Sequence, residues 1–353
     1  MPDGSVAMAP GQDRHALDYN PALDGLRAVA VALVFLFHAR LPGFEAGFLG
    51  VDVFFVLSGY LITTILLAEI DRTGSVNWRR FVLRRLWRLA PAVMALCVIF
   101  LLVAPILFPE VRSPVLDVFL TLSYMSDLTV ALLRNPQVLS HSWSLSVEEH
   151  FYLCWPLVLS ALWRLGSRRL LAILVVLYLV ASIWRVWVLS SGADWWVVYF
   201  RLDTRLGGLM FGACLAALCR AMSVAWLSER AKWLLVGWIV LAVASVQSGD
   251  WRDDGMLIWG VPAVELATAA LILGVRSGGG GLATVLSLAP LRWLGKLSYS
   301  LYLWHYPVLR LLRDQGDWRI ALLVGLPVSL ALAALSYATV ERWGLMMRAR
   351  VGL

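Results

Sequence analysis

The sequence predicts an all-α fold, a polytopic transmembrane helical bundle of about ten spanning helices with both termini in the cytoplasm. The 353-residue chain is 60% hydrophobic and only 15% charged, whereas soluble domains average about 25% charged residues. Its apolar residues form stretches of about 20 residues, the length that a helix needs to cross a bilayer. The net charge of +7 comes from basic residues clustered in short loops, which is the positive-inside pattern of membrane proteins.

Eleven apolar stretches can be marked by length, and the charges between them select those that span. They lie near 22–41, 48–70, 89–108, 115–133, 146–163, 169–190, 197–219, 231–248, 256–275, 293–312 and 319–340. Six arginines follow the second stretch, so that loop and the N-terminus belong in the cytoplasm. The next strongly basic loop, 164–169, is cytoplasmic only if one stretch before it does not span. Polar residues interrupt 115–133, and we expect that segment to be re-entrant or interfacial.

The rest of the chain follows from this choice. We expect a polar N-terminal tail without a cleavable signal, a membrane domain and a short cytoplasmic tail, at 1–18, 19–342 and 343–353. The glycine-rich run at 277–281 is a flexible link without the lysine of a nucleotide-binding loop. The four cysteines match no metal motif, so we expect no metal site and no disulfide. We expect a multi-pass protein of the inner (plasma) membrane.

The first apolar stretch carries ionisable residues that a simple anchor would exclude. Arg27 and His38 are eleven residues apart, so they share one helix face with a separation of about 16 Å. Asp24 falls near the same stripe. The alternative is that Arg27 and His38 mark the two ends of the helix, with their polar groups at the membrane surfaces. Because that alternative does not explain the shared stripe, we expect a functional polar face.

Two short motifs come next. FFVLSGYLI, residues 54–62, places the Ser58 hydroxyl and Gly59 in the second helix, where Gly59 permits close backbone approach; such residues more often pack than bind. RRLWRLAP, residues 84–91, places Arg85 and Arg88 on one face at the cytoplasmic mouth of the third helix. Two guanidinium groups at this spacing suit phosphate oxygens, although ordinary positive-inside charge explains them equally well.

Two later segments carry more polar chemistry. HSWSLSVEEHFYLCWP, residues 141–156, places two carboxylates, two imidazoles and several hydroxyls at the outer start of one helix. Carboxylates there also favour the helix dipole, but Glu148 and Tyr152 share one face, and the helix continues into the membrane. LGKLSYSLYLWHYP, residues 294–307, carries polar groups through the penultimate helix, in which Pro307 permits a kink. We expect both segments to contribute to a site.

These motifs, in this order and with Arg-x10-His in the first helix, resemble the integral-membrane acyltransferase-3 family over about Tyr19 to Arg342. The resemblance implies transfer of an acyl group, often acetyl, from acyl-CoA to a hydroxyl of a sugar, a surface glycan or a glycosylated natural product such as a macrolide. Since the chain stops at Leu353, it resembles the stand-alone form without the C-terminal hydrolase-like domain.

The resemblance also implies site residues. Arg27 and His38 match the family's Arg-x10-His, Arg85 and Arg88 match its Arg-x-x-Arg, and Glu148 matches its glutamate.

Two residues depart from the family pattern. His150 stands where glutamine is frequent, and Gly207 replaces an acid seen in many relatives. The second departure puts an acceptor contact at position 207 in doubt.

The chemistry of the proposed reaction assigns roles to these residues. A sugar hydroxyl needs a base that is neutral near pH 7, and His38 is the histidine in the polar stripe of the first helix. Arg27, Arg85 and Arg88 are expected to bind the donor, and Glu148 to orient an imidazole or bind acceptor hydroxyls. Further substrate-binding candidates are Asp24, Ser58, Tyr60, Glu149, Tyr152, Tyr299 and His305. No Ser-His-Asp elbow motif is visible, so direct transfer is expected.

The rival hypothesis is a transporter or flippase for a glycan or lipid, because intramembrane polar residues such as Glu265 fit both functions. No internal repeat is visible, which disfavours a secondary transporter. The same polar residues disfavour an inactive scaffold. The expected partners are cytoplasmic acyl-CoA as cosubstrate, a sugar or natural-product acceptor and the lipid bilayer, with no nucleic acid and no permanently bound cofactor. The resemblance names neither the acceptor, the acyl chain length nor the oligomeric state.

Overall fold

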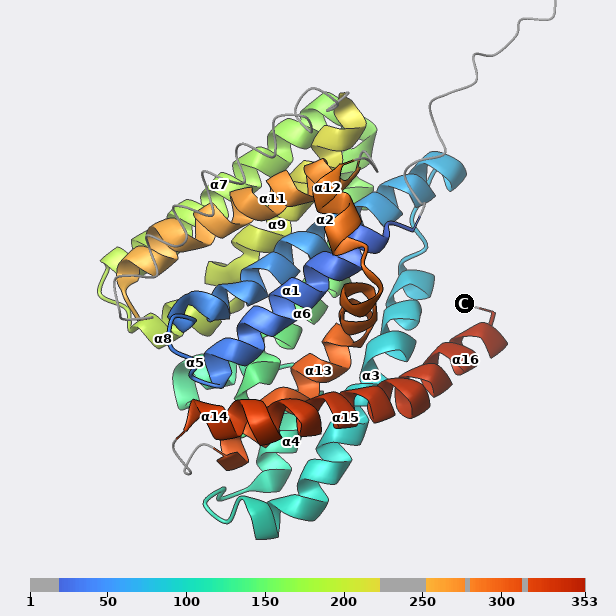
Figure 1. Ribbon diagram of the computed structural model, residues 1–353. Coiled ribbons are helices and arrows are strands. Elements are labelled where there is room, and N and C mark those ends of the chain that lie inside the picture. Colours follow the sequence, from blue (N-terminus) through green and yellow to red (C-terminus); the bar gives the residue numbers. More distant parts are fainter. Residues whose placement is uncertain (1–18, 223–251, 277–279, 313–316, 353) are drawn as a thin grey trace, which may run out of the picture.

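The computed structural model describes residues 19–222, 252–276, 280–312 and 317–352, and this part of the chain is helical without strands (Figure 1). The predicted span at 231–248, the N-terminal tail and most of the glycine-rich link lie outside the described residues. The long helices are α1 (Pro21–His38), α2 (Gly50–Thr73), α3 (Trp78–Leu107), α6 (Trp143–Leu162), α7 (Ser167–Ser190), α9 (Leu202–Ala221), α11 (Val261–Arg276) and α13 (Ala289–Leu312).

Shorter elements connect or extend these helices. They are η1 (Glu45–Leu49), α4 (Pro114–Leu122), α5 (Ser126–Leu133), η2 (Ser140–Ser142), η3 (Trp163–Leu165), α8 (Trp195–Phe200), η4 (Met256–Gly260) and α12 (Gly281–Leu286). The last described segment is one long rod made of α14 (Trp318–Ile320), η6 (Ala321–Gly325), α15 (Leu326–Ser336), η7 (Tyr337–Glu341) and α16 (Arg342–Arg350). In Figure 1 this rod and α3 lie on one side of α1 and α13, and α7, α9 and α11 lie on the other.

Local sequence signals define several helix ends. The Asn20 side chain accepts a hydrogen bond from the Ala22 amide at 3.0 Å, and Pro21 follows at the first helical position of α1. Asn77 caps α3 in the same way, accepting from Arg80 N at 2.9 Å. Gly74 ends α2 with a φ of 73°, a left-handed conformation that glycine adopts without steric cost. These caps satisfy amide and carbonyl groups that a helix end leaves unpaired.

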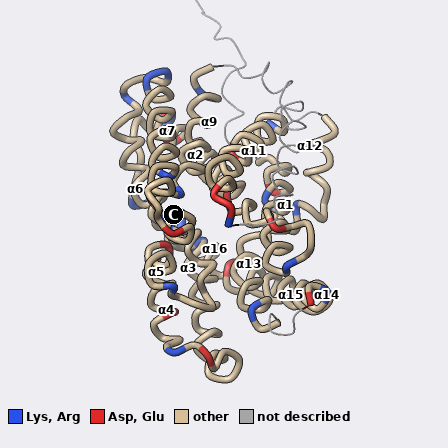
Figure 2. Tube along the Cα trace, turned by 90° about the vertical axis from the view of Figure 1, so that its left-hand side faces the viewer, with Lys and Arg blue, Asp and Glu red and all other residues tan. Residues whose placement is uncertain are grey.

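The described chain is a polytopic helical membrane protein, as predicted. Seven helical segments in it are long and apolar enough to cross a membrane. Figure 2 shows how few charged residues the trace carries. Helices α6 and α13, with 20 and 24 residues, are also long enough but less apolar, because they hold the two most polar motifs. The total of ten spans and the side of the two termini stay predictions.

The segment at 115–133 forms two short helices, as its polar residues suggested. Helix α4 has 9 residues and α5 has 8, whereas a span needs about 20. The turn between them includes Tyr124 in the left-handed region, with a φ of 54°. The buried Asp117 carboxylate accepts a hydrogen bond from Gln137 N at 3.1 Å and ties α4 to the loop that follows α5. Neither helix is long enough to cross the bilayer.

Basic loops gather at one end of the bundle, which we call the basic end. Arg220 at the end of α9 pairs with Asp71 at the end of α2. At the other ends of α7 and α9, Trp184 Nε1 donates to Asp203 Oδ2 at 2.8 Å, so these two helices are antiparallel. The start of α7, and with it the loop at 164–169, therefore lies at the basic end. We call the opposite end, where α1 finishes, the cavity end.

The topology makes a prediction that labelling can test. In a cysteine-free background, a cysteine at Ser167 should react with a membrane-impermeant thiol reagent only from the cytoplasmic side, and one at Gln137 only from outside. The charge asymmetry of the loops is the physical reason. Labelling of position 167 from outside would contradict the assigned orientation.

Small residues allow the central helices to touch. A Cβ atom on Gly59 of α2 would lie 2.0 Å from the Leu209 carbonyl oxygen of α9, and one on Gly295 of α13 would lie 1.9 Å from the Asp24 carbonyl oxygen of α1. The close approach expected at Gly59 is therefore confirmed. Lipid supplies little hydrophobic drive for helix association, so tight packing at such glycines holds membrane helices together. The contacts fix α1 against α13 and α2 against α9.

Candidate active site

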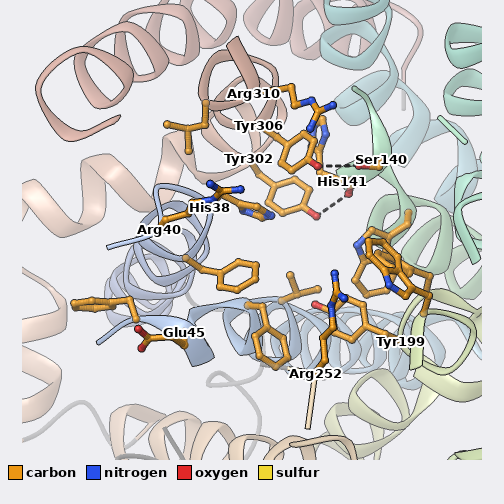
Figure 3. Close-up of a pocket in the computed structure, with 18 of the residues that line it drawn as sticks. His38, Arg40, Glu45, Ser140, His141, Tyr199, Arg252, Tyr302, Tyr306 and Arg310 are labelled. Atoms are coloured by element: carbon orange, nitrogen blue, oxygen red, sulfur yellow. Dashed lines mark hydrogen bonds between the residues drawn. The ribbon is translucent and has the colours of Figure 1, made fainter. Parts of the chain in front are cut away.

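A cavity of about 460 Å³ opens among the cavity ends of α1, η1, α6, α8 and α13 (Figure 3). Its wall is largely aromatic, formed by Phe37, Phe44, Phe48, Trp143, Trp196, Tyr199, Phe200, Tyr302 and Tyr306. His38 and His141 also line it. Flat aromatic faces surrounding a few polar groups suit an amphipathic ligand such as a sugar.

His38 and His305 form a hydrogen-bonded imidazole pair in this region. His305 Nδ1 lies 2.7 Å from the Tyr302 carbonyl oxygen, so it carries the proton and leaves Nε2 as an acceptor. His38 Nδ1 lies 3.1 Å from that Nε2 and 2.9 Å from the Val34 carbonyl oxygen. These contacts assign a proton to His38 Nδ1 and the lone pair to its Nε2. A neutral imidazole of this tautomer can accept a proton at Nε2.

His141 joins this pair, so three of the chain's five histidines gather at the cavity end. Its Nε2 donates to the Leu303 carbonyl oxygen at 3.1 Å, and its ring stacks on Tyr306 at 5.1 Å between centroids. The Tyr302 hydroxyl lies 2.6 Å from Ser144 Oγ (Figure 3 shows the ring of Tyr302 beside His141). None of His141, Tyr302 and Tyr306 was among the predicted site residues, although all three lie in the two polar motifs.

A second polar group lies toward the basic end. Arg27 Nε donates to Ser298 Oγ at 3.3 Å. Glu148 lies next to Ser58 and Tyr152 and within electrostatic range of Arg27 and Arg85. Five helices, α1, α2, α3, α6 and α13, supply these side chains. We call the set of Arg27, Ser58, Arg85, Arg88, Glu148, Glu149, Tyr152 and Ser298 the basic-end cluster.

Glu148 does not orient the imidazole of His38. Among the contacts of the described residues, none joins Glu148 to a histidine; the imidazole of His38 is instead held by His305. This corrects one of the two roles expected for Glu148. The reason is the helix rise: the polar stripe of α1 is about 16 Å long, and Glu148 meets it at the Arg27 end.

The two arginines of the third helix belong to the basic-end cluster. Arg85 stacks on the Tyr152 ring, with its Cζ 5.0 Å from the ring centroid. Arg88 lies one turn further along α3 and within electrostatic range of Arg27. Three guanidinium groups thus face one region at the basic end, an arrangement suited to phosphate oxygens.

Comparison with known proteins identifies the family of this chain. Residues 20–338 match the acyltransferase-3 model, described as an acyltransferase domain. The chain belongs to the acyltransferase-3 family. It is similar to the peptidoglycan O-acetyltransferase OatA of Listeria monocytogenes, with 31% identity over 93% of this chain and 56% of the relative. It is also similar to the O-acetyltransferase OatA of Staphylococcus aureus, with 33% identity over 92% of this chain and 57% of the relative. The chain spans little more than half the length of these relatives. No solved structure matches it.

Three other predicted residues of this acyltransferase-3 chain occupy different surroundings. Asp24 accepts a hydrogen bond from the Tyr19 hydroxyl at 2.6 Å at the start of α1. Tyr60 is buried and packs with Leu215 and Ala216 of α9. It therefore faces away from the Ser58 hydroxyl, because residues two apart on a helix point to different sides. The Tyr299 hydroxyl donates to the Leu89 carbonyl oxygen at 2.9 Å and ties α13 to α3.

A buried charged network supports the aromatic wall from behind. Arg205 pairs with Asp52 at 2.8 Å, both almost fully buried, and its guanidinium lies 4.7 Å from the Tyr199 ring centroid. Glu265, which accepts from the Tyr178 hydroxyl at 2.9 Å, belongs to the same network. Removing one partner from a buried pair costs about 3–5 kcal/mol, so such a network holds its neighbours in place.

The family departure at Gly207 falls in this network and not in the cavity wall. A Cβ atom there would lie 3.1 Å from Glu265 Oε1 and 3.2 Å from Arg185 Nη1. The other departure, His150, lies 3.8 Å from the Asp127 carboxylate of α5, also outside the cavity lining.

Proposed function

We propose that this protein is an O-acetyltransferase of the plasma membrane that moves an acetyl group from acetyl-CoA to a hydroxyl of a peptidoglycan sugar. The observation that carries the proposal is the His38–His305 pair beside an aromatic cavity. The relatives named as peptidoglycan and other O-acetyltransferases support the acetyl group and the sugar acceptor.

The imidazole pair suits direct transfer between thioester and hydroxyl. His38 Nε2 takes the proton from the sugar hydroxyl as its oxygen attacks the acetyl carbonyl carbon. The new carbon–oxygen bond forms, the carbon–sulfur bond breaks, and the CoA thiolate recovers the proton from His38. During the reaction His305 Nε2 accepts the hydrogen bond from His38 Nδ1 and stabilises the transient imidazolium.

The basic-end cluster suits the donor. Its guanidinium groups offer planar, charge-assisted bonds to CoA phosphates arriving from the cytoplasm. The pantetheine arm then has to cover the length of the polar stripe, about 16 Å from Arg27 to His38. On this arrangement the donor enters from one end of the bundle and the acceptor from the other.

The proposal is tested with purified protein in detergent or liposomes, given acetyl-labelled acetyl-CoA and isolated peptidoglycan. We expect label to appear on the glycan as base-labile ester. A transporter or flippase should neither consume acetyl-CoA nor label the glycan. A protein that does neither, while remaining folded by thermal denaturation, would contradict the proposed function.

A further inference from the structure

Two arginines of the cavity lining have no ion-pair or hydrogen-bond partner among the described residues. Arg40 follows His38 by two residues, and Arg310 follows His305 by five on α13. Figure 3 shows Arg40 beside His38 and Arg310 beside Tyr306. Each cation is therefore attached to the same chain segment as one of the two paired imidazoles.

Three other described arginines at the cavity end are paired. Arg134, Arg201 and Arg319 each contact an aspartate, at 2.5, 2.5 and 3.3 Å. Arg112 is exposed in the loop after α3 and has no described partner, but it does not line the cavity. Within the lining, unpaired positive charge thus gathers next to the reactive imidazoles.

The acid of the described lining offsets only part of this charge. The Glu45 carboxylate accepts a hydrogen bond from the Gly43 amide at 3.1 Å and stabilises its own loop. A third lining arginine, Arg252, places its guanidinium 5.6 Å from the Trp196 ring centroid on the opposite wall (Figure 3). The described lining therefore has three arginines against one glutamate.

The backbone at Arg40 is held in an unfavourable conformation. Its φ is 58°, the left-handed region in which a side chain costs energy that glycine avoids. Leu41 N donates to the Leu36 carbonyl oxygen at 3.1 Å and Arg40 N to the Phe37 carbonyl oxygen at 3.0 Å, the bonding of a helix end that favours glycine. Strained residues of this kind concentrate at ligand-binding positions.

We propose that the acceptor is an anionic sugar whose carboxylate or phosphate is bound by Arg40 and Arg310 while one of its hydroxyls reaches His38. Guanidinium groups bind both anions through charge-assisted hydrogen bonds. The inference rests on the proposed acetyl transfer and adds the charge of the substrate. Fixing the anion at two points orients the hydroxyl toward the base, which is how binding energy supports a reaction between two substrates.

Matched acceptors test the charge. With labelled acetyl-CoA, wild-type protein should acetylate N-acetylmuramic acid with a KM about ten- to a hundredfold below that for its neutral methyl ester. For phosphate, the KM for N-acetylglucosamine 1-phosphate is compared with that for neutral N-acetylglucosamine in the same assay. A charge preference in the first pair alone identifies a carboxylate acceptor, and in the second alone a phosphate acceptor. Equal transfer within both pairs overturns the anion inference and leaves acetyl transfer standing.

Variants of Arg40 and Arg310 test whether these arginines cause the preference for the anionic acceptor. Arg40→Gly suits the left-handed backbone, so the protein should stay folded with unchanged or higher thermal stability. Its KM for the anionic acceptor should rise about ten- to a hundredfold, with that for the neutral acceptor unchanged. Arg310→Gln should act alike, and Arg112→Gln, which removes a charge outside the cavity, should match wild type. If Arg40→Gly and Arg310→Gln still prefer the anionic acceptor, these arginines do not bind the anion and the assignment is overturned. Loss of the preference in Arg112→Gln would overturn it as well. No transfer to any of the four sugars, nor to peptidoglycan, would contradict the proposed function itself.

Discussion

His38→Ala should lower acetyl transfer by about two to four decades, the usual effect of removing a general base. The imidazole is replaced by a methyl group, so the sugar hydroxyl keeps its proton and remains a weak nucleophile. The α1 helix should persist, because alanine favours helix and the Gly295 contact with α1 is untouched. Turnover of acetyl-CoA by the purified variant measures the effect, and calorimetric titration measures donor binding, which should be nearly unchanged.

His150→Ala is the matched control for this experiment. It also removes an imidazole from the membrane domain, but His150 contacts Asp127 of α5 and lies outside the cavity lining. We expect near-normal transfer from this variant. Near-normal transfer from His38→Ala as well would remove His38 from the mechanism and direct attention to His141 or His305, its neighbours in the imidazole group.

Arg88→Ala should raise the Michaelis constant for acetyl-CoA by one or two decades, with a smaller change in the turnover of the bound complex. A hydrogen bond to a charged group contributes about 1.5–3 kcal/mol, and the loss acts on donor binding because Arg88 lies at the opposite end of the polar stripe from His38. Arg88→Lys should restore part of the affinity, since an ammonium cannot make a bidentate contact with phosphate. Titration of acetyl-CoA against each variant provides the measurement.

Arg80→Ala serves as the control, because Arg80 is an exposed arginine near the start of the same helix. Its loss should change the donor's Michaelis constant little. If Arg88→Ala binds acetyl-CoA normally while His38→Ala loses it, the assigned roles are reversed. The donor would then approach from the cavity end.

Hydrophobic patterning and charge predicted much of the architecture. The length of the apolar stretches predicted the helices, because a bilayer requires about 20 apolar residues for each span. Loop charge predicted that the start of α7 lies with the other basic loops, and polar interruptions predicted that 115–133 does not form a span. Whether a segment spans the bilayer depends on its own apolar length and on the charges of the adjacent loops. Residues close together in the sequence are therefore enough to predict it.

The grouping of the candidate residues depended on how the helices pack. Helical spacing placed Arg27 and His38 on one stripe of α1, yet only the packing of other helices against it shows that His305 of α13 contacts His38 and that Glu148 of α6 meets the Arg27 end. The unpaired Arg40 and Arg310 likewise become neighbours of one cavity through that packing. Contacts between residues more than 250 positions apart leave no periodic signal in the sequence. They are fixed by shape complementarity, here at glycines such as Gly295, where the backbones of two helices touch.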